Sequence, residues 1–124
     1  MLNPKALTEI LALEQPGEPS FLARMIEAFR ESAPVYVARM KAASEVGDHE
    51  TIVGVAHALK GAAATLGAEH VRAIALDLEL RGRHMSVAGA QEQLAALADA
   101  LEQALAALTE LALQATPRNQ PQGT

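Results

Sequence analysis

Residues 87–111 carry the clearest pattern in the chain and read VAGAQEQLAALADALEQALAALTEL. Apolar residues recur there in alternating steps of three and four, at Val87, Ala90, Leu94, Leu97, Leu101, Ala104, Leu108 and Leu111. Such a stripe is the face that a helix buries against neighbouring helices. Only about three heptads are present, and the e and g positions that flank them lack a regular pattern of charges. Both features favour packing within one chain over a long coiled coil.

The composition of the 124 residues also indicates helices. The chain holds 27 Ala and 17 Leu, which are strong helix formers, and its aromatic residues are only Phe21, Phe29 and Tyr36. Because strands favour β-branched and aromatic residues, we predict an all-α fold, an antiparallel four-helix bundle with an additional short N-terminal helix. The length fits one domain, which we place at residues 1–115 before a disordered tail at 116–124.

Charge and residue usage exclude several classes of function. Ten basic and fifteen acidic residues give a formal charge of −5 without any basic block, which argues against nucleic-acid binding. The absence of cysteine excludes disulfides, zinc–thiolate sites and thiol nucleophiles. No apolar run approaches the roughly 18 residues that span a bilayer, and the first ten residues lack the apolar segment of a secretory signal. We therefore expect a cytoplasmic protein without membrane insertion.

The N-terminal half predicts two helices. The first runs from Pro4 to Glu14, and its apolar face consists of Leu7, Ile10 and Leu11. The second begins after the N-cap Ser20 and reaches about residue 46. Pro34 lies inside it, and the sequence leaves open whether this proline kinks one helix or divides it into two.

Two more helices precede the last one. The third should run from His49 to Leu66, because Asp48 is a good N-cap and Gly67 a good C-terminal stop. The fourth should cover residues 68–80, with an apolar face made of Val71, Ile74, Ala75 and Leu78. A basic turn at 81–84 follows, and Ser86 is the expected cap of the last helix.

The expected helix at 49–66 has an unusual outward face. With about 100° per residue, its buried stripe consists of Ile52, Val55, Ala56, Leu59, Ala63 and Leu66. The opposite side carries His57 with Lys60 on its flank, and is otherwise made of small residues, namely Val53, Gly54, Gly61 and Ala64. Each glycine costs the helix about 1 kcal/mol relative to Ala. Either a partner's backbone approaches closely there, or the glycines serve packing between helices.

His57 and Lys60 suggest phosphoryl chemistry. A neutral imidazole is nucleophilic at one nitrogen, so it can accept a phosphoryl group and give it up again. Lys60 lies one turn away, where an ammonium offsets charge on the transferring group. The chain has no P-loop or other Gly-rich nucleotide loop. We therefore expect a carrier of phosphoryl groups that does not itself draw them from ATP, and no cofactor.

Residues 56–68, AHALKGAAATLGA, closely resemble the signature of histidine-containing phosphotransfer (HPt) domains. The resemblance extends from about residue 21 to 111 and includes the start of the second helix, the turn Gly47-Asp48 and the pair Leu78-Glu79. It implies a four-helix bundle with His57 as the phosphoacceptor, through Nε2, and Lys60 as the residue that stabilises the phosphoryl group. Many members have serine after the Lys-Gly pair, whereas this chain has Ala62 and Ala63, so a hydroxyl contact is missing here.

The resemblance also implies partners. Family members relay phosphate between aspartates of receiver domains, or from a hybrid sensor kinase to a response regulator, and any metal belongs to the receiver. Gly61 resembles the glycine that leaves room for the receiver, and we expect docking at Val53, Gly54, Gly61 and Ala64. We expect a monomer that is not an enzyme with its own turnover. The Met1 start favours a stand-alone protein, although a piece of a larger sensor kinase remains open.

Two other hypotheses stay open on the sequence. One is a helical adaptor that binds a partner and carries no phosphate. The other is an oligomer formed through the stripe at 87–111. The remaining histidines, His49, His70 and His84, have no neighbours typical of a metal or catalytic site, and we expect them to be structural or solvated.

Overall fold

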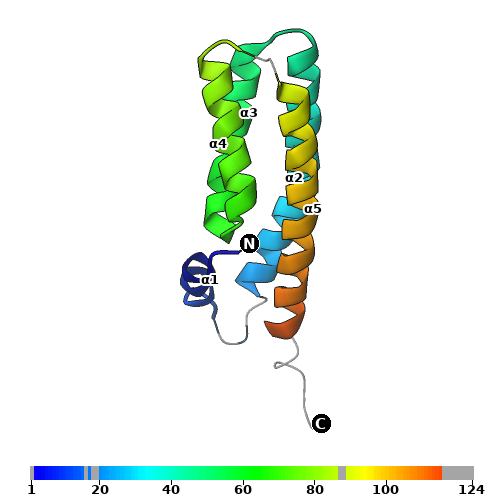
Figure 1. The fold of residues 1–124 in the computed structure, drawn as a ribbon. Helices are drawn as coiled ribbons and strands as arrows, with labels where there is room; N and C mark the ends of the chain where they lie inside the picture. Colours follow the sequence, from blue (N-terminus) through cyan, green and yellow to red (C-terminus); the bar gives the residue numbers. More distant parts are fainter. Residues whose placement is uncertain (1, 16, 18–19, 87–88, 116–124) are drawn as a thin grey trace.

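The computed structural model describes residues 2–15, 17, 20–86 and 89–115 (Figure 1). In this part of the chain there are five helices and no strand: α1 (Pro4–Leu11), α2 (Phe21–Glu45), α3 (His49–Leu66), α4 (Glu69–Arg83) and α5 (Ala90–Ala115). Helices α2 to α5 run alternately up and down as an antiparallel bundle, and α1 lies at one end of it (Figure 1). The predicted all-α fold is confirmed. The expected tail at 116–124 lies outside the described residues.

Local capping fixes the ends of α2 and α3. Ser20 accepts a hydrogen bond from the backbone N–H of Ala23, and Asp48 accepts one from that of Thr51. Gly67 ends α3 in the left-handed conformation, with φ 73°. These findings confirm the predicted bounds of α3. Helix α2 continues through Pro34, whose side chain is exposed, so the proline does not divide it.

Helix α1 is shorter than predicted, because it ends at Leu11 and not at Glu14. The carboxylate of Glu14 instead accepts the backbone N–H groups of Phe21 (3.1 Å) and Leu22 (2.9 Å) at the start of α2. The first N–H groups of a helix have no partner within it, so a carboxylate from outside stabilises them. The expected apolar face was wrong at Leu11, which is 44% exposed, while Leu7 and Ile10 are buried.

Helix α4 is longer than predicted and includes Arg81, Gly82 and Arg83, which the sequence analysis assigned to a turn. The helix ends in a Schellman motif, in which Ser86 N donates to Arg81 O and Met85 N to Gly82 O. Met85 takes the left-handed position of this motif, with φ 57°. The expected role of Ser86 was wrong, because Ser86 belongs to this turn and α5 begins only at Ala90.

The core lies between the four long helices. Its most deeply buried large side chains are Leu22, Met40, Leu59, Leu78, Leu97, Leu108 and Val71. The stripe predicted on α5 points into this core: Ala90, Leu94, Leu97, Leu101 and Leu108 are buried, and Ala104 and Leu111 pack against the core. Val87 lies outside the described residues. The stripe is therefore used within the chain, as the short heptad pattern predicted.

The N-terminal segment is fastened to the end of α3. Asn3 N donates to Gly67 O at 2.7 Å, and Leu2 forms an isolated β-bridge with Ala68. A Cβ at position 67 would lie 2.8 Å from Asn3 O, so glycine is required there by the close approach as well as by its positive φ. In the described residues, no helix has the length and apolar character needed to cross a membrane.

Candidate functional site

Helix α3 places His57 on the surface, opposite to the residues that it buries. Its buried residues are the six of the predicted stripe, Ile52, Val55, Ala56, Leu59, Ala63 and Leu66. The His57 side chain is 64% exposed. The helical period and a well-packed stripe therefore hold the imidazole at the surface without the support of a loop.

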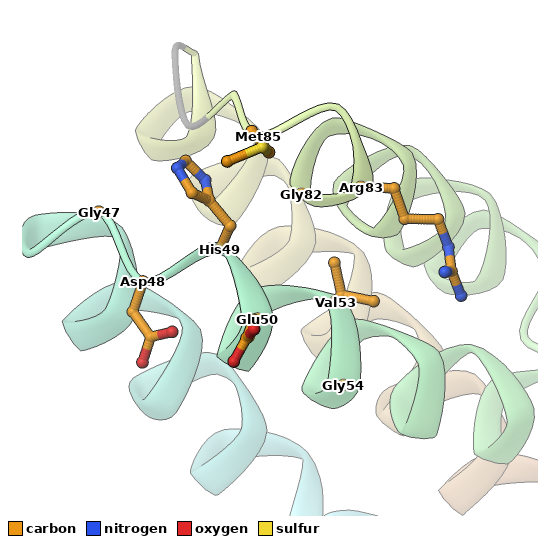
Figure 2. Close-up of a pocket in the computed structure, with 9 residues that line it drawn as sticks. All are labelled: Gly47, Asp48, His49, Glu50, Val53, Gly54, Gly82, Arg83 and Met85. Atoms are coloured by element: carbon orange, nitrogen blue, oxygen red, sulfur yellow. The ribbon is translucent and has the colours of Figure 1, made fainter.

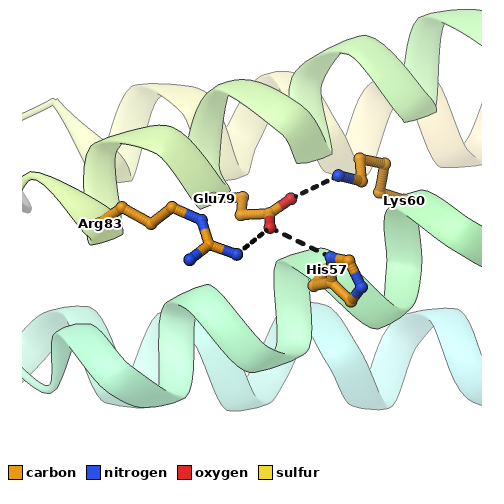
Figure 3. A network of polar contacts seen from close by, with 4 residues as sticks. All are labelled: His57, Lys60, Glu79 and Arg83. Carbon is orange, nitrogen blue, oxygen red and sulfur yellow. Dashed lines mark hydrogen bonds and ion pairs between the residues drawn. The ribbon is translucent and has the colours of Figure 1, made fainter.

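The His57 ring leans towards α4, where it meets a buried carboxylate (Figure 3). Glu79 is the buried polar residue of the described core, with a side chain only 4% exposed. Its Oε2 lies 3.1 Å from His57 Nδ1 and 2.7 Å from an Nη atom of Arg83. Its Oε1 lies 2.8 Å from Lys60 Nζ. One carboxylate thus joins the three basic side chains of the site.

Glu79 is ionised under ordinary conditions in spite of its burial. The Lys60 ammonium has the largest effect on its pKa, and with the hydrogen bonds from Arg83 and His57 it outweighs desolvation and lowers this pKa to about 2. An ionised carboxylate can only accept hydrogen bonds. The hydrogen between Glu79 and His57 must therefore sit on His57 Nδ1. In the neutral ring this leaves the lone pair on Nε2, and Figure 3 shows the second ring nitrogen directed away from Glu79.

The surface around His57 is made of small residues. Gly54, Gly61 and Ala64 are exposed, and a Cβ built at either glycine would meet no atom of another described helix or loop within 4 Å. Packing between helices therefore does not explain these two glycines, which removes one of the two readings that the sequence left open. Val53 differs from the other three expected docking residues, because it is half-buried and its Cγ2 would lie 2.7 Å from a Cβ at Gly82 of α4.

The chain matches a known protein family. The sequence model of the Hpt domain family matches residues 24–115, which is most of the chain. The chain belongs to the Hpt domain family. No curated protein sequence matches it closely. Hpt domains are helical phosphotransfer modules of phosphorelays, in which they interact with receiver domains and kinases.

In this Hpt domain, sequence reasoning found two of the four residues of the polar network and missed the other two. His57 and Lys60 were expected together, and they do lie together, but Lys60 Nζ contacts Glu79 instead of lying free beside the ring. Glu79 received no role from the sequence, and Arg83 was assigned to a turn beyond the helix. The available signal was their spacing: an acid and a base four residues apart form a pair on one helix face.

An open groove of about 720 Å³ adjoins this site toward the beginning of α3 (Figure 2). Val53 and Gly54 line it from α3, and Gly82, Arg83 and Met85 line it from the end of α4. Met85 is 73% exposed. The groove therefore continues the small-residue surface of α3 as far as the turn between α4 and α5.

The other histidines of the Hpt domain lie apart from the network. His70 and His84 are exposed, and His49 is half-buried at the start of α3, as the sequence analysis expected for solvated or structural residues. The Nδ1 atom of His49 is buried and has no hydrogen-bond partner in the described part of the chain. In the part of the chain that the structure describes, no group of three His, Asp or Glu side chains is arranged to hold a metal ion.

Proposed function

We propose that this chain is a phosphorelay carrier in which His57 takes a phosphoryl group from one receiver aspartate and passes it to another. A hybrid sensor kinase and a response regulator are the expected source and destination. The observation that carries this proposal is the contact between His57 Nδ1 and the buried, ionised Glu79, 3.1 Å long, on an otherwise exposed imidazole. It prepares Nε2 as the nucleophile.

The transfer step follows from this arrangement. The Nε2 lone pair attacks the phosphorus of the aspartyl phosphate, so an N–P bond forms while the P–O bond breaks and the carboxylate leaves with its electron pair. The Nδ1 proton stays on the ring, and the positive charge that develops there lies next to the Glu79 carboxylate. The reverse step, with an aspartate of the next receiver as the attacking group, regenerates neutral His57.

Charge in the network favours an incoming phosphoryl group. Counting His57 as neutral, one carboxylate (Glu79) and two cations (Lys60 and Arg83) leave a formal surplus of one positive charge. Phosphoryl transfer depends mainly on position and on electrostatic stabilisation of the equatorial oxygens. Lys60 is the cation nearest in sequence to His57, one turn along the same helix, and we assign it the contact with the phosphoryl group.

The partner surface lies on α3. We propose that a receiver docks over Gly54, Gly61 and Ala64, with Val53 at the edge toward α4. In support, the two glycines weaken the helix and gain nothing from contacts within the described chain. A close approach of a partner's backbone would compensate for that cost. We further expect a cytoplasmic monomer that acts as a carrier without its own turnover of substrate.

The test is phosphoryl uptake from a phosphorylated receiver domain, measured by intact mass. The wild-type chain should gain about 80 Da per phosphoryl group, and the gain should disappear in acid. His57→Gln should keep its helicity and show no gain. His70→Gln, which removes another exposed histidine, is the matched control and should behave as wild type. Uptake by His57→Gln, or no uptake by a folded wild-type chain from several receivers, contradicts the proposal and favours the adaptor hypothesis.

A further inference from the structure

Lys60 has a second role in the structure besides the one proposed above. Its Nζ lies 2.8 Å from Glu79 Oε1, and its side chain is only 27% exposed. Oε1 accepts no hydrogen bond of good geometry in the described part of the chain, so the Lys60 ammonium is what balances its charge. In the unphosphorylated chain, Lys60 is therefore the partner of a buried carboxylate.

The two roles of Lys60 compete. His57 faces Glu79 with Nδ1, and its other nitrogen, which would carry the phosphoryl group, is directed away from Glu79 (Figure 3). An ammonium that moves to the phosphoryl oxygens must withdraw from Oε1. A buried carboxylate that loses one of its two cations is destabilised, because water cannot reach Oε1 to replace the lost contact. Something has to hold Glu79 while Lys60 is away.

Arg83 is placed to do so. Its side chain starts one turn after Glu79 on α4, and one Nη atom already lies 2.7 Å from Oε2. A guanidinium carries five N–H groups in a planar fork that can span both oxygens of a carboxylate. In the described residues Arg83 makes no ion pair other than this one, and its side chain is 55% exposed, so its remaining N–H groups can turn toward Oε1.

We propose that Arg83 is a positioning residue that keeps Glu79 in place when Lys60 moves to the phosphoryl group on His57. The inference rests on the proposed function, because it needs a phosphorylated His57. This role of Arg83 differs from that of an ordinary ion pair within a helix in one measurable respect. An i,i+4 pair stabilises both forms of the chain equally, whereas a residue that replaces Lys60 matters more in the phosphorylated form.

The experiment compares the urea unfolding of the phosphorylated and unphosphorylated chains. Phosphoramidate, a small donor that releases ammonia as the N–P bond to His57 forms, phosphorylates the protein without a receiver. Arg83→Gln should lower the folding equilibrium constant of the unphosphorylated chain by about fivefold. For the phosphorylated chain the reduction should be about ten times as large, or about fiftyfold. Arg83→Lys should fall between Arg83→Gln and wild type, because a single ammonium cannot span both oxygens.

The matched control is Arg72→Gln. It removes the same charge from the same helix, where Arg72 pairs with Glu69 at 3.0 Å instead of with Glu79. It should affect both forms equally. An equal effect of Arg83→Gln on both forms, with phosphorylation that depends on His57, overturns this inference alone. A wild-type chain that gains no phosphoryl group at His57, from phosphoramidate or from a receiver, overturns the proposed function and this inference together.

Discussion

The glycines on the two sides of α3, Gly82 of α4 on one side and Gly54 and Gly61 on the other, have opposite surroundings. On the side that faces α4, a Cβ at Gly82 would lie 2.7 Å from Val53 Cγ2 and 3.3 Å from His49 O, so glycine lets the helices approach. On the outward side, a Cβ at Gly54 or Gly61 would meet no other part of the described chain within 4 Å. Packing among the described residues therefore explains the first glycine and does not explain the other two.

Polar groups show the same contrast. On the α4 side, three basic side chains contact the oxygens of Glu79, and that carboxylate is almost fully buried. On the outward side, the exposed imidazole of His57 lies among small residues. The charged groups of the inner side thus pair with one another within the chain. The glycines of the outward side lower helix stability, and no contact in the described residues compensates for that cost. This difference is typical of a surface shaped by a partner.

The largest effect is expected at Glu79, on the inner side. Its pKa is lowered from 4.5 to about 2, first by Lys60, so its contribution to stability is present above pH 4.5 and is lost as the pH falls toward 2. The full shift corresponds to about 3 kcal/mol of unfolding free energy. Urea unfolding from neutral pH down to about pH 3 should therefore show a steeper loss for wild type than for Glu79→Gln. Parallel curves would contradict this role of the carboxylate.

A bulky residue on the outward side should impair transfer without a loss of stability. Gly61→Arg fills the space next to His57, so transfer from a receiver should fall by about 100-fold, as for a disrupted interface centre. Its unfolding free energy should not fall below that of wild type, because no atom of the described chain occupies that space and arginine is a better helix former than glycine. Ala106→Arg, at an exposed position of α5, is the control. If Gly61→Arg transfers phosphate at the wild-type rate, the outward glycines do not serve docking.

A bulky residue on the inner side should act on stability. Gly82→Val forces its side chain against Val53 and the backbone of His49, and should lower the free energy of unfolding by about 2 kcal/mol. Gly54→Val, which enters open space, is the matched control. Urea unfolding of both variants measures the difference. Equal effects of the two substitutions would remove the distinction between the two sides of α3.

The smallest expected effect is a gain in stability when an outward glycine is replaced by alanine. Gly54→Ala should raise the free energy of unfolding by about 1 kcal/mol, since alanine is the better helix former and its methyl group would not contact another helix or loop of the described chain. Gly61→Ala should do the same. Thermal unfolding of the two variants tests this. A loss of stability in either would mean that the free chain itself needs the glycine.

Sequence alone predicted the parts of this protein that depend on neighbours along the chain. The bounds of α3, its caps Asp48 and Gly67, and its buried stripe follow from helical periodicity and local hydrogen bonds. The exposed His57 with Lys60 one turn away follows from the same period. These features do not depend on which helices pack against α3, so they could be predicted from the sequence.

Only the tertiary structure decided what lies across from His57. The register between α3 and α4 brings Glu79 and Arg83 to it, and a register between two helices depends on packing that no local pattern records. The same holds for Gly82, which the sequence places in a turn at 81–84 and which is a close contact in the fold. It also holds for Glu14, whose carboxylate leaves the expected first helix to stabilise the start of α2. Sequence thus determined the exposed histidine, and packing determined the buried carboxylate that contacts it.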